Sequence, residues 1–137
     1  MAIGDVRSYA FGAEGVEVAL EPGNYLILAK GEFRQTGNTG DAPTGGELNL
    51  YLRRLDGSTL TLDESTVYLG LIEDTLSSGT AVLQATLELR RDMPTPAQPL
   101  PPQLPPAGYL HLQVIELEAA IHSAHLCVME VGDITTH

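Results

Sequence analysis

The stretch Gly79–Arg91 reads Gly-Thr-Ala-Val-Leu-Gln-Ala-Thr-Leu-Glu-Leu-Arg-Arg and alternates between apolar and other residues. One set of alternate positions is apolar throughout: Ala81, Leu83, Ala85, Leu87 and Leu89. The positions between them are polar or charged, with the exception of Val82. Successive side chains of a β-strand point to opposite faces, so this pattern predicts a strand with one buried and one solvated face.

The same alternation recurs along the chain, and turn residues separate the segments. Strands are predicted at 16–20, 24–34, 48–53, 60–62, 67–71, 79–91, 109–117 and 121–131. Glu21-Pro22-Gly23 is typical of a turn, and Asp56-Gly57 indicates a hairpin. The sequence therefore predicts an all-β fold, an antiparallel two-sheet jelly-roll sandwich of about eight strands.

Two segments do not fit the strand pattern. Residues 1–14 show no sustained period and are predicted to form an N-terminal arm ahead of a jelly-roll domain at 15–137. Residues 93–107 form a proline-rich loop, in which seven of the thirteen residues Pro94–Pro106 are proline. Proline cannot donate to a strand ladder, so this segment is expected to be extended and outside the sheets. It is either a stiff surface connection or a docking strip laid on a neighbouring subunit, with Pro99 and Pro102 as candidate contacts.

The net charge of −11 excludes some classes of partner. Seven basic residues stand against 18 acidic ones, and Lys30 is the only lysine, so such a surface would repel a phosphate backbone. No apolar run approaches the ~18 residues of a membrane span, and Met1–Asp5 lacks the features of an export signal. We expect no nucleic-acid and no membrane partner. The acidity indicates either solubility alone or a partner with a basic surface or divalent cations.

Residues that could carry chemistry are few. Cys127 is the only cysteine and lies in an apolar stretch, so we expect a buried small hydrophobe rather than a reactive thiol. His122 and His125 are three positions apart, which in a regular strand places them on opposite faces and prevents joint metal binding unless there is a bulge. The acidic pairs Asp63-Glu64 and Glu73-Asp74 are expected to be solvated turns rather than calcium ligands. We therefore expect no catalytic residue, no cofactor and no metal, and no enzymatic activity.

Three further stretches carry a resemblance to a known family: Glu21-Pro22-Gly23-Asn24-Tyr25-Leu26-Ile27-Leu28-Ala29-Lys30, Asp63-Glu64-Ser65-Thr66-Val67-Tyr68-Leu69 and Ala124-His125-Leu126-Cys127-Val128-Met129-Glu130-Val131-Gly132. Their order and spacing resemble the trimeric jelly rolls of the tumour necrosis factor and complement globular-head superfamily, in the version found in bacteriophage virions and bacterial surface proteins. The resemblance covers about residues 15–132. It implies a compact homotrimer with an apolar three-fold seam.

The resulting functional hypothesis is a structural virion protein. The chain would be a trimeric capsid decoration (cement) protein on the surface of a bacteriophage capsid. It would contact the major capsid protein or other virion subunits. Val82 and the Ile115/Leu117 side of the seventh predicted strand are the candidates for the trimer seam. Tyr9 and Phe11 of the arm are expected to dock on neighbours, so deletion of residues 1–12 is expected to leave the sandwich intact. The alternative is a trimeric receptor- or glycan-binding head of a phage fibre or bacterial surface protein.

Overall fold

The computed structural model describes residues 4–36, 44–69, 78–90, 106–117 and 119–132. Over these residues the secondary structure consists of eight strands. They are β1 (Val6–Phe11), β2 (Val16–Leu20), β3 (Gly23–Gln35), β4 (Gly45–Arg54), β5 (Thr59–Tyr68), β6 (Ser78–Leu89), β7 (Gly108–Leu117) and β8 (Ala119–Val131). No helix in the described part of the chain has the length and hydropathy needed to cross a membrane.

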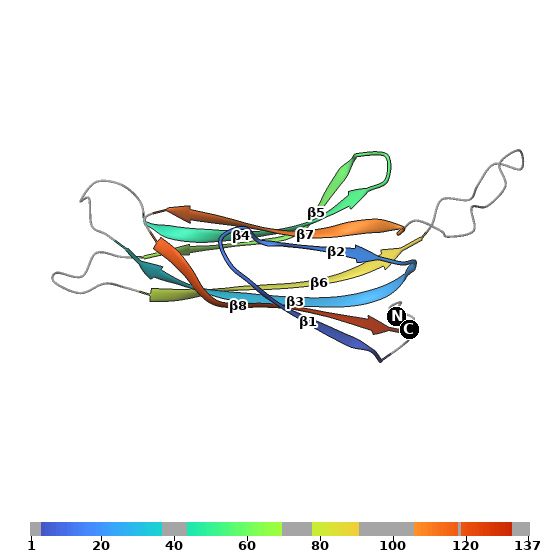
Figure 1. Ribbon diagram of the computed structural model, residues 1–137, viewed down its shortest axis with the longest axis horizontal. Helices are drawn as coiled ribbons and strands as arrows, with labels where there is room; N and C mark the ends of the chain where they lie inside the picture. Colours follow the sequence, from blue (N-terminus) through green and yellow to red (C-terminus); the bar gives the residue numbers. More distant parts are fainter. Residues whose placement is uncertain (1–3, 37–43, 70–77, 91–105, 118, 133–137) are drawn as a thin grey trace, which may run out of the picture.

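The strands form two four-stranded sheets that pack face to face as two layers (Figure 1). One sheet has the order β1-β8-β3-β6 and the other the order β2-β7-β4-β5. Every pairing within the sheets is antiparallel. Successive strands β1 and β2, β3 and β4, and β7 and β8 lie in different sheets, as the wrapped connections of a jelly roll require. The predicted fold class, an antiparallel two-sheet jelly roll of about eight strands, is confirmed.

The alternating stretch on which the prediction rests forms β6. Its predicted inward residues Ala81, Leu83, Leu87 and Leu89 are buried, while Val82 between them is 62% exposed. The inward rows of β3 and β8 face those of β4 and β7 and complete the core. Its largest fully buried side chains include Tyr25, Ile27, Phe33, Leu48, Leu50, Leu52, Leu83, Leu110, Leu126 and Val128.

Gly46 in β4 lies directly against a side chain from the opposite sheet. A Cβ atom added to Gly46 would lie 2.1 Å from ring carbons of Phe33 in β3. Phe33 is completely buried, so its ring has no open space into which it could move. Glycine at this position therefore allows the ring to pack directly on the backbone of the opposite sheet.

The prediction of an N-terminal arm is wrong for residues 6–11. These residues form β1, which pairs along β8 from Val6 opposite Met129 to Phe11 opposite Ala124. Phe11 is only 9% exposed and belongs to the core, and Tyr9 packs against the core from the same strand. Neither ring is therefore free to dock on a neighbour. Arg7 shares this inward row, which explains why the segment shows no simple apolar alternation.

The segmentation of the sequence also needs correction at β5. The predicted strands at 60–62 and 67–71 are joined in one continuous strand up to Tyr68, whereas 70–77 lie outside the described residues. β5 forms the outer edge of its sheet and its side chains are all at least partly exposed, so polar residues in its middle are tolerated. The proline-rich segment, with Pro99 and Pro102, lies largely outside the described residues.

The position of Phe11 leads to a first prediction, which reverses the expectation for the deleted arm. Truncation of Phe11→Ala removes a buried ring and should lower the free energy of unfolding by about 3 kcal/mol. Deletion of residues 1–12 should destabilise the sandwich further, because β8 then loses one of its two partner strands. Chemical denaturation monitored by circular dichroism measures both changes. A deletion variant with the stability of the full chain would contradict the placement of β1.

A second prediction concerns the contact between the sheets. Gly46→Ala should destabilise the protein by about 1–3 kcal/mol, because the added methyl group must displace the Phe33 ring in a filled core. Gly132→Ala is the matched control, since a Cβ atom there meets nothing within 4 Å. The two melting temperatures should differ clearly, with the control close to the unmodified protein. Equal stability of the two variants would show that the sheets are not in this close contact.

Candidate functional site

The first candidate surface is the outward side of the β1-β8-β3-β6 sheet, which we call the apolar face. Val6, Leu28 and Val82 are exposed there by 53%, 42% and 62%. Strand pairing places Leu26 beside Met129, and Leu28 beside Cys127, so partly buried apolar side chains fill the space between the exposed ones. Cys127 was expected to be buried in the core. It instead lies on this outward side, with its Sγ 3.4 Å from the Ser8 hydroxyl oxygen.

The structure separates the residues proposed for the trimer seam. Val82 belongs to the apolar face. Ile115 and Leu117, by contrast, alternate with the core residues Leu112 and Val114 and therefore lie on the outward side of the other sheet. Within one copy the two groups therefore lie on opposite outer surfaces of the sandwich. The prediction overlooked Leu28, although apolar residues on both faces of 26–29 were a signal for it.

Charged residues adjoin the apolar face on the same sheet, and Lys30 among them pairs directly with Val82. The chain bends at a bulge where Ser123 has φ +52° and the pairing of β3 with β8 shifts. The bulge places His125 opposite Lys30 and His122 opposite Glu32, so both histidines share the outward side. The expectation that they face opposite sides is wrong for this reason. Lys30, Glu32 and His125 line a shallow depression of about 180 Å³.

The electrostatics of this region are set by one close ion pair. Arg34 donates a hydrogen bond from Nε to Glu32 Oε1 at 2.9 Å. This bond lowers the pKa of the Glu32 carboxyl below its ordinary value, and the nearby charge of His122 contributes in the same direction. Both partners are largely solvated, so the pair contributes little to stability.

The acidic pairs considered for calcium have other roles or lie outside the described residues. Asp63 of β5 accepts a hydrogen bond on Oδ2 from the backbone N–H of Gln84 in β6 at 3.0 Å. Its Oδ1 accepts one from the Glu64 N–H at 2.9 Å. Glu73-Asp74 is not among the described residues. Within the described ranges no group of three or more His, Cys, Asp or Glu residues could hold a metal ion.

The second candidate surface is the outward side of the β2-β7-β4-β5 sheet. Three cross-strand pairs of β4 and β7 stand in sequence there, and we call them the polar ladder: Asn49 with Gln113, Tyr51 with His111, and Arg53 with Tyr109. Each pair combines polar or aromatic side chains. The ladder lies directly opposite the core residues Leu48, Leu50 and Leu52 on the other side of β4.

Close contacts hold the side chains of the polar ladder in place. The rings of Tyr51 and His111 stack with their centres 4.9 Å apart and their planes within 4°. Glu17 of β2 reaches both neighbouring pairs, since its Oε1 accepts a hydrogen bond from Arg53 Nη2 at 3.2 Å and its Oε2 lies 3.3 Å from His111 Nε2. The Arg53 guanidinium lies over the Tyr109 ring, 4.9 Å from its centre.

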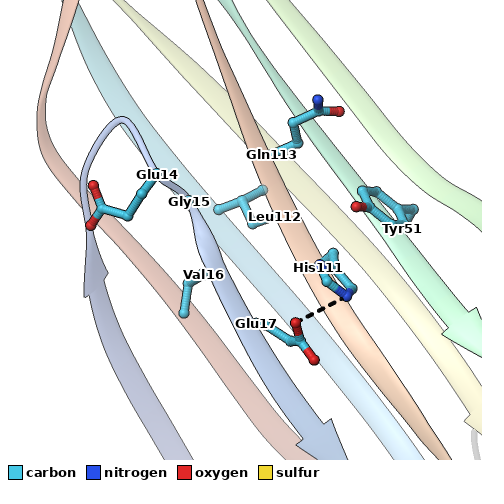
Figure 2. Close-up of a pocket in the computed structure, with 8 residues that line it drawn as sticks. All are labelled: Glu14, Gly15, Val16, Glu17, Tyr51, His111, Leu112 and Gln113. Atoms are coloured by element: carbon cyan, nitrogen blue, oxygen red, sulfur yellow. Dashed lines mark ion pairs between the residues drawn. The ribbon is translucent and has the colours of Figure 1, made fainter.

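A hollow of about 370 Å³ opens between the polar ladder and the turn that leads into β2. Residues 14–17 line one side, and Tyr51, His111, Leu112 and Gln113 line the other (Figure 2). Gly15 brings the turn against β7. It has φ +73°, and a Cβ atom there would lie 2.1 Å from the Leu112 carbonyl oxygen. Glycine at this position thus allows the turn to form one wall of the hollow.

Two buried polar atoms on this surface lack a hydrogen bond from any described residue. One is Asn49 Oδ1 and the other is His111 Nε2, which lies near Glu17 without the geometry of a hydrogen bond. Buried polar groups are normally paired with protein or water, so each of these atoms leaves a hydrogen bond unmade within the described residues. The hollow and its ladder were not predicted from the sequence. The outward polar positions of residues 49–53 were visible, but their register with β7 was not.

Comparisons with known proteins show the fold and no family. No protein-family model and no curated protein sequence matches this chain. Among solved structures, the chain is similar to Eiger TNF from S. frugiperda, with a TM-score of 0.54 and 11% identity over 86% of this chain and 67% of that one. A weaker likeness, with a TM-score of 0.35 and 15% identity over 92% and 72% of the two chains, is to the CBM22-1 xylan-binding domain of Paenibacillus barcinonensis Xyn10C. The first likeness shows the jelly-roll fold.

Proposed function

We propose that this chain is a non-enzymatic head protein of a bacteriophage virion, which assembles as a homotrimer and attaches to the capsid surface as a decoration protein. The observation that carries the proposal is the apolar face. A jelly roll already buries one side of each sheet in its core, so exposed Leu28 and Val82 on the outer side are explained by a partner. Burial of each such side chain contributes about 1.5–3 kcal/mol.

Charge favours a second copy of the chain as that partner. The chain carries a net charge of −11, so most surfaces of two copies repel each other. The outward side of the β1-β8-β3-β6 sheet differs, because Lys30 and Arg34 balance Glu32 and Glu88 there. Three copies can therefore approach through this face with less repulsion than through any acidic surface. The resemblance of three sequence stretches to trimeric heads supports a three-fold arrangement.

The proposal also includes attachment of the trimer to a capsid. It is supported by the likeness of three sequence stretches to virion heads and by the acidity that remains on the outside of such a trimer. The contact with the major capsid protein is not assigned to Tyr9 and Phe11, because β1 is part of the sandwich. The proline-rich segment at 93–107 remains the proposed docking strip.

The second candidate function is a recognition head that binds a receptor or glycan. The hollow beside the polar ladder favours it, because an open depression with aromatic and hydrogen-bonding walls is typical of small-ligand sites. This surface belongs to the sheet opposite the apolar face, so a trimer built on the apolar face leaves the hollow accessible. Decoration and recognition are thus compatible in one protein.

A third prediction tests the trimer. The unmodified protein should sediment at three times the 14.6 kDa of one chain at micromolar concentration. Leu28→Glu and Val82→Lys should each raise the dissociation constant of the trimer at least about 100-fold, because the seam would bury an unpaired charge, in the second case beside Lys30. Leu55→Glu is the control, since Leu55 is 51% exposed in the β4–β5 hairpin, away from the face. A monomeric unmodified protein, or equal behaviour of all three variants, would contradict the seam.

A fourth prediction tests the capsid role. Cryo-electron microscopy of native particles that carry this protein should show three-fold densities of sandwich size on the outside of the shell. Leu28→Glu should reduce occupancy of the shell strongly, while Leu55→Glu should leave it unchanged. If mass spectrometry finds the protein absent from purified particles, the decoration role is wrong, whatever the oligomeric state in solution.

A further inference from the structure

We infer that the polar ladder and the hollow beside it form a binding site for a neutral, hydroxyl-rich glycan segment. The inference deepens the recognition role proposed above and rests on it, but it needs neither the trimer nor the capsid. The hollow has about 370 Å³, within the roughly 300–1,000 Å³ of small-ligand sites. Its position on a sheet, rather than on loops, fixes the binding groups before a ligand arrives.

The length of the site suits a short oligomer rather than a single small molecule. From Asn49 to Arg53 the ladder advances four residues, which at about 3.4 Å per residue spans roughly 14 Å of strand. Tyr51 of β4 and Tyr109 of the neighbouring β7 supply aromatic surface along this length, with one face of Tyr109 covered by the Arg53 guanidinium. The Tyr51 ring cannot swing freely, because it is stacked on His111, and the Arg53–Glu17 hydrogen bond holds the next pair.

The hydrogen-bonding groups favour hydroxyls as the ligand chemistry. Sugar hydroxyls both donate and accept, and the site offers both functions through the Gln113 amide, the Tyr51 hydroxyl and the Asn49 amide. Asn49 Oδ1 lacks a hydrogen bond within the described residues but is buried, so a ligand hydroxyl reaches it only after the amide turns outward. His111 Nε2 is also buried and lies 3.3 Å from Glu17 Oε2, so the direct contacts to the ligand come from Tyr51 and Gln113, which line the hollow.

Charge and polarity argue against other classes of ligand. Glu17 and Glu14 border the hollow, so a phosphate, sialic acid or uronate would be repelled. A protein partner normally buries a central apolar patch. The exposed Leu117 of the same outward row lies four positions beyond Gln113 in β7 and does not line the hollow. A neutral carbohydrate is the class that both observations allow.

The test uses an array of neutral oligosaccharides of two to six units, built from glucose, galactose, mannose, xylose or N-acetylhexosamines. Sialylated and uronate glycans and lysine oligomers are included as competing classes. We expect saturable binding to at least one neutral series and none to the anionic glycans or lysine oligomers. Tyr51→Ala and Gln113→Ala should each weaken binding about tenfold, as expected when one contact to the ligand is lost.

The control variants distinguish a wrong binding site from a wrong recognition function. Tyr68→Ala removes a tyrosine that is 80% exposed at the end of β5 and does not line the hollow, so it should bind as the unmodified protein does. Gln113 is exposed, so Gln113→Ala keeps the fold even if Tyr51→Ala does not. Neutral-glycan binding that survives both ladder variants would overturn this site and leave the recognition role standing. Binding to no neutral glycan, or only to the anionic or lysine probes, would overturn the glycan assignment itself.

Discussion

Strand β3 is paired along both of its edges and buried along its inward row, and the position of every other element depends on its register. β6 lies on one side of it and β8 on the other, so it joins three of the four strands of its sheet. Its Phe33 ring then rests against the backbone of Gly46 in the opposite sheet. A slip of one residue would turn the whole inward row outward, and the packing of both sheets would be lost together.

The same strand has a second apolar row, and this links the fold to the proposed assembly. Most strands of a two-layer sandwich need apolar side chains on only one face, because the other face is solvated. β3 carries Leu26 and Leu28 on its outward side, next to Met129 and Cys127 of β8. The sheet β2-β7-β4-β5 has polar and aromatic residues in the equivalent central positions. The two outer surfaces are therefore chemically distinct, one suited to self-association and the other to a polar ligand.

The fold was largely predictable because alternation is a local property of each strand. The two main errors also have local causes, since Arg7 interrupts the inward row of β1, and polar residues interrupt the exposed edge strand β5. The polar ladder was not predictable in the same way. Glu17, Tyr51 and His111 come from three strands far apart in the sequence, and only the register of β2 and β4 on β7 brings them together. The bulge at Ser123, which places both histidines on one side, likewise has no sequence signature of its own.

The hydrogen bond from Gln84 N–H to Asp63 has a consequence for how copies of the chain can meet. β5 and β6 end their respective sheets, and unpaired backbone groups at such ends are templates for open-ended fibres. Asp63 occupies one of these donors on β6 and places a carboxylate where an incoming strand would bring its carbonyl oxygens. Strand addition at this point of the β6 edge is thereby disfavoured, whereas β1 and β2 end the two sheets on the other side. Contact through side-chain surfaces, which can end in a closed ring, does not depend on any of these edges.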